Sequence, residues 1–131
     1  MADQPDETSD FGRQYGPLAK DVFRAIAREA ATQGDEPSAQ ARMYADMGKP
    51  EHTLAFLLEC ALPDDEKRVI LAAAYLKRAE HTEERAREFD RKFHRPFPLL
   101  YKGAALDRAT ARRIQANQTI TPEHGKDIPI L

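Results

Sequence analysis

Three pairs of adjacent glutamate and histidine residues could supply metal ligands: Glu51-His52, Glu80-His81 and Glu123-His124. Imidazole and carboxylate groups bind zinc and iron well. Adjacent residues on a helix, however, point about 100° apart and cannot chelate one ion from a single face. The chain also lacks the histidine spacings of helical zinc sites and of di-iron bundles. We therefore expect these pairs to mark helix starts, where acids stabilise exposed N–H groups, and we predict no metal and no cofactor.

Cys60 is the other candidate for chemistry, because one thiol with several histidines is the minimum for thiol catalysis. It lies in the most apolar part of the chain, beside Ala61 and Leu62, and burial there would raise its pKa and make it unreactive. The six glycines are too scattered to form a phosphate loop or a nucleophile elbow. We predict that the chain is not an enzyme.

Basic residues are dense between Arg85 and Arg113: this stretch contains nine Lys and Arg residues and only three Asp and Glu residues. Such a stretch can follow a phosphate backbone, so contact with nucleic acid is the alternative to protein binding. Glu88 and Asp90 interrupt the stretch and would neutralise part of it. The residues for this alternative are Arg85, Arg87, Arg91, Lys92, Arg95, Arg108, Arg112 and Arg113.

The net charge of −2 over 131 residues conceals two halves of opposite charge. Residues 1–66 have 14 acids and 6 bases (−8), whereas residues 67–131 have 8 acids and 14 bases (+6). Complementary halves can meet in an assembly, which makes a second copy of the chain the simplest protein partner. The longest strongly apolar run, Thr53 to Leu58, is too short to span a membrane, and the acidic amino terminus has no secretory signal. We expect a cytoplasmic protein with no membrane contact.

Apolar side chains recur at helical spacing and no segment alternates at period two, so we predict an all-α fold. The expected architecture is a small bundle of five to six short antiparallel helices. A flexible acidic tail is predicted over residues 1–12, the helical domain over 13–117 and an extended segment over 118–131. Helices are expected from Pro17 to Gly34, from Ser38 to Gly48, from Pro50 to Leu62, after Asp64, from Thr82 to Phe93 and after Asp107.

Two helical hairpins are predicted, one over residues 41–62 and one over 72–93. Each has a small residue three positions before a tyrosine, a short break four positions after it and Glu-His-Thr near the break. The second helix of the first hairpin is the most apolar in the chain, so we expect it to lie at the centre of the fold.

Residues 41–62 resemble one unit of a tetratricopeptide repeat. The matching positions are Ala41, Tyr44, Gly48, Thr53, Leu57, Cys60 and Ala61. In that family, small residues at the positions of Ala41 and Thr53 let the two helices close, and the glycine lets the chain reverse. Residues 72–93 match less well, because Ala79 replaces the glycine and Ala86 falls two positions late. The resemblance implies a module that binds other proteins, as an adaptor, a regulator or an accessory subunit.

The predicted contact surface combines a charged helix with the segment that follows it. On the helix, Glu83–Arg87 and Glu88–Lys92 have the spacing that favours ion pairs. Prolines on both sides of Phe97 predict an extended segment as far as Tyr101. The predicted partner-binding residues are Arg87, Arg91, Arg95, Phe97, Leu99 and Tyr101.

Overall fold

A computed structural model describes residues 9–120, and helices are the regular structure found there. The predicted all-α fold is confirmed. The parts of the predicted acidic tail and carboxyl-terminal segment in residues 1–8 and 121–131 lie outside the described residues. The elements are α1 (Asp10–Tyr15), the 3-10 helix η1 (Gly16–Leu18), α2 (Asp21–Thr32), α3 (Pro37–Asp46), α4 (Pro50–Leu58), α5 (Asp64–Phe93) and α6 (Pro98–Gln115).

The first predicted hairpin exists as α3 and α4. Pro37 and Pro50 occupy the first positions of the two helices, where the missing N–H of proline costs no hydrogen bond. Gly48 ends the turn between them with a φ of 70°, which favours glycine. A Cβ atom on Gly48 would lie 3.1 Å from the backbone nitrogen of Arg78. The turn therefore packs directly against the backbone of α5.

The second predicted hairpin is wrong, because residues 72–93 belong to one continuous helix, α5, of 30 residues. No glycine or proline lies between Asp64 and Phe93, so nothing interrupts the backbone hydrogen bonds at the predicted break. Thr82, predicted as the cap of a separate helix, is a buried residue within α5. A helix of this length extends about 45 Å.

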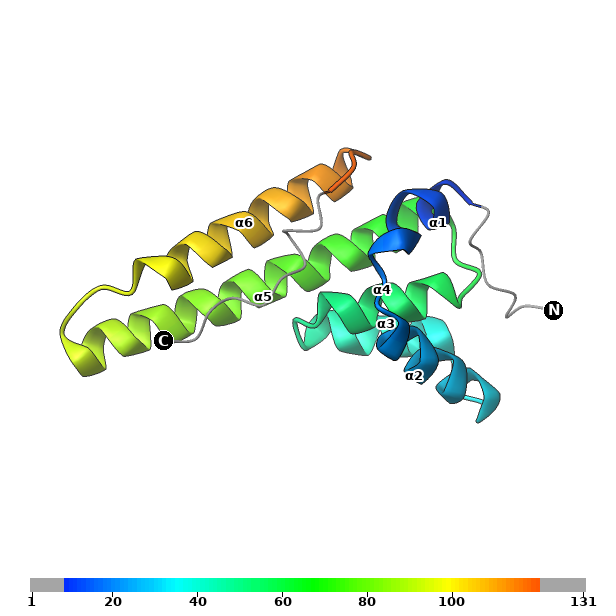
Figure 1. Ribbon diagram of the computed structural model, residues 1–131, viewed down its shortest axis with the longest axis horizontal. Coiled ribbons are helices and arrows are strands. Elements are labelled where there is room, and N and C mark those ends of the chain that lie inside the picture. The colour runs from blue at the N-terminus through cyan, green and yellow to red at the C-terminus, as the bar shows by residue number, and fades with distance from the viewer. Residues whose placement is uncertain (1–8, 121–131) are drawn as a thin grey trace.

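The extended segment predicted from Phe97 to Tyr101 is also wrong. α6 begins at Pro98 and continues through Asp107, the predicted start of the last helix. The chain reverses at His94, whose φ of 56° places it in the left-handed region that often ends a helix. α6 then runs back along α5, so the two helices form a long antiparallel hairpin (Figure 1).

The helical domain begins earlier than predicted. The Ser9 side chain accepts a hydrogen bond from the Gly12 N–H and caps α1, which buries Phe11 and Tyr15. The Tyr15 hydroxyl donates to the Gln118 carbonyl at 3.0 Å. Ile120 is buried in the same core, so the chain remains in contact with the domain beyond the end of α6.

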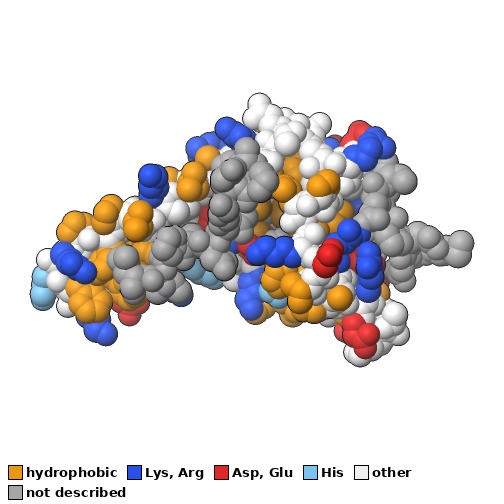
Figure 2. Space-filling view, in the orientation of Figure 1, with side chains coloured by type: hydrophobic (Ala, Val, Ile, Leu, Met, Phe, Trp, Pro, Cys, Tyr) orange, Lys and Arg blue, Asp and Glu red, His pale blue; other side chains and the backbone are white. Residues whose placement is uncertain are grey.

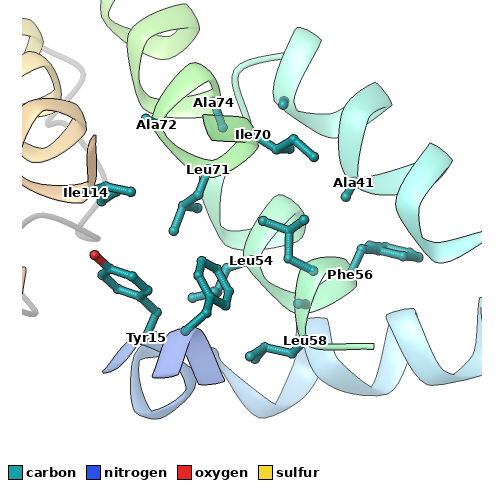
Figure 3. Packing of buried hydrophobic residues seen from close by; sticks show 14 of the residues in the cluster. Tyr15, Ala41, Leu54, Phe56, Leu58, Ile70, Leu71, Ala72, Ala74 and Ile114 are labelled. Atoms are coloured by element: carbon teal, nitrogen blue, oxygen red, sulfur yellow. The ribbon is translucent and has the colours of Figure 1, made fainter. Parts of the chain in front are cut away.

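The main core surrounds α4, as its composition predicts. Every residue from Thr53 to Leu58 is buried, because α2, α3 and α5 all pack against this helix. Leu71 of α5 and Ile114 of α6 enter the same core from the other side (Figure 3). The removal of these apolar surfaces from water is the main source of stability for the fold.

Helices α1–α4 gather around the first half of α5 and leave its second half uncovered by them (Figure 1). We call residues 82–106, the outer parts of α5 and α6, the arm, and the rest of the described chain the body. A second, smaller core of Ala86, Phe97 and Leu100, with Phe89 packed against it, holds the arm together. The structure therefore presents a two-helix projection on a helical body.

Candidate interaction site

The root of the arm is fixed by a buried ion-pair cluster that joins three helices. Arg78 of α5 donates from Nε and Nη2 to the two carboxylate oxygens of Asp107 of α6, at 2.8 and 2.9 Å. Its Nη1 donates to Glu51 of α4 at 3.0 Å. Asp107 is almost fully buried. The guanidinium of Arg78 also lies 5.4 Å from the centroid of the Tyr75 ring. Burial raises the pKa of the Tyr75 hydroxyl. Burial by itself would lower the pKa of Arg78, but the hydrogen bonds and charge of Asp107, together with the charge of Glu51, hold it above its usual range.

A second ion pair joins α5 and α6 next to this cluster. Arg108 of α6 donates from Nε and Nη2 to the carboxylate of Glu83 on α5. This hydrogen-bonded pair lowers the pKa of Glu83 and raises the pKa of Arg108. Glu83 was predicted to pair along its own helix with Arg87, but in the structure its hydrogen-bonded partner lies across the hairpin.

The tip of the arm is built from three phenylalanine rings that meet edge to face. The ring centroids of Phe89, Phe93 and Phe97 are 5.4 to 5.8 Å apart, a geometry that aromatic pairs favour. Asp90 fixes the turn, because its two oxygens accept hydrogen bonds from the Phe97 N–H at 3.2 Å and from the Tyr101 hydroxyl at 2.9 Å. The hydrogen bond to Asp90 raises the pKa of Tyr101.

These rings line a surface pocket of about 380 Å³ whose other lining residues are Lys92 and Arg95. The Lys92 ammonium lies 5.6 Å from the centroid of Phe93, and the Arg95 guanidinium lies 5.2 Å from the centroid of Phe97. Both distances are within the range of cation–π attraction. The tip thus combines an apolar floor with a basic rim.

The arm exposes more large apolar side chains than its two helices can cover. Phe93 is 52% exposed, Leu99 47%, Leu106 46% and Tyr101 36%. Hydrophobic and basic side chains lie next to each other over the outer end of the arm (Figure 2). Exposed apolar groups clustered among charged ones are typical of surfaces that bind other molecules.

The structure brings most of the predicted partner-binding residues to the arm. Arg87, Arg91 and Arg95 are exposed there, as are Leu99 and Tyr101. Phe97 is the exception, because it packs between Phe89 and Phe93 and is buried. Two apolar residues were missed, Phe93 and Leu106. The signal for Leu106 was its position seven residues after Leu99, which places the two side chains on the same face of a helix once α6 starts at Pro98.

The residues of the nucleic-acid alternative do not all lie together. Arg85, Arg87, Arg91, Lys92 and Arg95 are exposed on the arm or at its tip. Arg108 is bonded to Glu83, and Arg112 and Arg113 lie in the last turn of α6, at the opposite end of that helix from the tip. The basic stretch of the sequence is therefore spread along about 20 Å of helix.

Glu51 and Cys60, two of the candidates for chemistry, lie among contacts that stabilise the fold. Glu51 belongs to the Arg78 cluster, and Glu123-His124 lies outside the described residues. Among residues 9–120, no group of three or more His, Cys, Asp or Glu side chains is arranged to hold a metal ion. Cys60 is buried, which raises the pKa of its thiol, and its Sγ donates to the Leu57 carbonyl.

His52 lies between two aromatic rings, with its centroid 4.3 Å from that of Phe23 and 4.8 Å from that of Tyr44. Burial, with a smaller contribution from the charge of Lys49, lowers the pKa of His52 below its ordinary value of 6.5. The neutral imidazole is therefore favoured in the folded state. The unfolded chain binds a proton at this residue more readily, so acidification favours unfolding.

We expect the free energy of unfolding to fall as the pH is lowered through 6.5 towards the lowered pKa of His52. Urea unfolding at pH 7.5 and at pH 5.5 measures this loss. The His52→Gln variant, which has no imidazole, should lose less stability over the same interval. Equal losses in the two proteins would show that His52 does not contribute to the pH dependence.

Comparison with models of protein families, with curated proteins and with solved structures gives no match. The resemblance of residues 41–62 to a tetratricopeptide repeat stays a prediction. In the described part of the chain, no helix is both long and apolar enough to cross a bilayer. We therefore identify the candidate interaction site from the geometry of the arm.

Proposed function

We propose that this protein binds another protein through its arm and acts as an adaptor, a regulator or an accessory subunit. The observation that carries the proposal is the exposure of Phe93, Leu99 and Leu106 on a two-helix projection that helices α1–α4 do not cover. Among residues 9–120, the outer parts of α5 and α6 have no further helix over them, so a partner can supply cover for these side chains. The proposed partner is a different protein or a second copy of this chain.

Rigidity at the root supports this proposal. The Arg78–Asp107 and Glu83–Arg108 pairs hold α5 and α6 in one register, so the exposed side chains keep fixed positions before a partner arrives. A preorganised surface loses less conformational entropy on binding than a mobile one. The surrounding arginines add attraction for acidic surfaces and speed association.

Contact with nucleic acid is the alternative, and the exposed bases Arg85, Arg87 and Arg91 favour it. It is the weaker proposal because Arg108 is bonded to Glu83 and the remaining bases are separated along α6. Phosphate-backbone binding needs several free cations in one track.

The proposal predicts that substitutions on the arm remove captured proteins. The tagged full chain and a Leu99→Asp/Leu106→Asp variant would be used as baits in a lysate of the source cells, with quantitative mass spectrometry. Proteins captured by the unmodified chain should decrease at least about tenfold with the variant, because binding would bury two carboxylates in place of two apolar side chains.

The control is Val69→Asp, which places one such carboxylate on an exposed apolar residue of α5 outside the arm. Circular dichroism would establish that all three baits keep their helices. Capture that is unchanged by the arm variant, or reduced equally by the control, would contradict the proposal.

A further inference from the structure

The tip pocket has a shape and composition that restrict what can bind there. Its volume of about 380 Å³ is at the lower end of the range for ligand sites, which suits one or two side chains. Phe89, Phe93 and Phe97 form an apolar floor, and more than half of Phe93 is exposed. An occupant must therefore bring an apolar group.

The charges at the rim are available to that occupant. The ion pairs found within residues 9–120 involve neither Lys92 nor Arg95. Both cations instead lie over the rings of Phe93 and Phe97. The predicted pair between Glu88 and Lys92 is not formed. Asp90, the carboxylate nearest in sequence, is engaged by the Tyr101 hydroxyl and the Phe97 N–H.

We propose that the tip pocket binds an acidic segment of a partner protein, with one apolar side chain of that segment packed on the phenylalanine floor and flanking carboxylates at Lys92 and Arg95. This inference rests on the proposed function and names the chemistry of its partner. The charges are complementary, and a carboxylate that pairs with a guanidinium or an ammonium next to an apolar surface gains a charge-assisted hydrogen bond.

The geometry favours a peptide over single-stranded nucleic acid. Bases bind by stacking on the faces of aromatic rings. Here the rings contact one another by their edges, and the Lys92 ammonium and the Arg95 guanidinium lie over Phe93 and Phe97. An aliphatic or aromatic side chain needs no parallel face and can pack against the exposed part of Phe93 at the floor of the pocket.

The absence of tryptophan from the chain allows a direct test. The probe is the synthetic peptide Ac-Gly-Asp-Glu-Trp-Leu-Asp-Glu-Gly-amide, titrated with the full-length protein while tryptophan emission is recorded. The expected result is a saturable shift of the emission to shorter wavelength, because the indole leaves water for the pocket. A peptide with Asn and Gln in place of its acids should bind at least about fivefold more weakly.

Two variants of the protein localise the binding. Phe93→Ser should weaken binding of the acidic peptide at least about tenfold, and Lys92→Gln/Arg95→Gln at least about fivefold. The matched controls are Val69→Ser, which removes an exposed apolar residue elsewhere on α5, and Arg112→Gln/Arg113→Gln, which removes two bases far from the tip. Both controls should bind as the unmodified protein does.

Three outcomes would overturn the inference: no emission shift, equal binding of the acidic and neutral peptides, or equal losses in the tip variants and the controls. A labelled thymidine oligonucleotide that binds the full chain and is released by Phe93→Ser would also overturn it and assign the tip to nucleic acid. If the peptide fails while the Leu99→Asp/Leu106→Asp variant still loses captured proteins, the acidic anchor is wrong and the proposed function stands.

Discussion

Replacing Arg78 with methionine is expected to lower the free energy of unfolding by about 3–5 kcal/mol, which is a large part of the stability of a domain of this size. Arg78 supplies the guanidinium that pairs with Asp107 and Glu51. Methionine fills a similar volume but leaves the Asp107 carboxylate buried without that cation. Urea unfolding followed by circular dichroism measures the loss.

Two further variants separate the buried charge from the general effect of substitution. Arg78→Met/Asp107→Leu removes both charges of the bidentate pair and should recover much of the lost stability, because the buried carboxylate is removed together with its cation. Lys77→Met breaks the exposed pair between Lys77 and Glu80 on the same helix and should cost less than about 1 kcal/mol. A loss of that small size for Arg78→Met would show that the cluster does not stabilise the root of the arm.

Replacing Glu80 with proline is expected to cost about 3 kcal/mol or more, because Glu80 lies inside the continuous helix α5. Proline removes one backbone hydrogen bond, and its ring clashes with the carbonyl four residues earlier. The bend would also separate the two pairs that join α5 to α6, since Glu80 lies between Arg78 and Glu83. Thermal and urea unfolding measure the effect.

Glu80→Ala is the control, because it removes the same exposed side chain and keeps the backbone hydrogen bond. It should change the stability by less than about 0.5 kcal/mol. The comparison distinguishes the observed helix from the hairpin that the sequence predicted at this point. If the proline and alanine variants were equally stable, the chain would turn near Glu80 and the arm would not be a continuation of α5.

The predictions that succeeded depend on local patterns. The apolar spacing and the prolines of α3 and α4 predicted a helix pair with a turn at Gly48, and the density of apolar residues placed α4 at the centre. Side chains on one helix share a face according to its period alone, and the turn glycine is readable from its position. The basic character of the arm was also readable, since charge belongs to the residue type.

The predictions that failed lie at positions where the local sequence is compatible with two backbone conformations. Thr82 and the Glu-His-Thr segment can start a helix, and nothing in the sequence shows that Thr82 is buried inside one. Pro98 can end an extended segment or begin a helix, and it begins α6. In both cases the packing of α5 against α6 selects one of two possible backbone conformations.

The sequence by itself determined that the chain is helical, that its centre lies at α4 and that its second half is basic. Only the tertiary structure decided that Arg78 pairs with Asp107 across 29 residues, that Phe97 is buried and that Phe93 and Leu106 are exposed. Helix formation follows from hydrogen bonds and side-chain spacing within a few residues. The partner of a charge, and the exposure of a ring, depend on how two helices are rotated and aligned, which their packing against each other fixes.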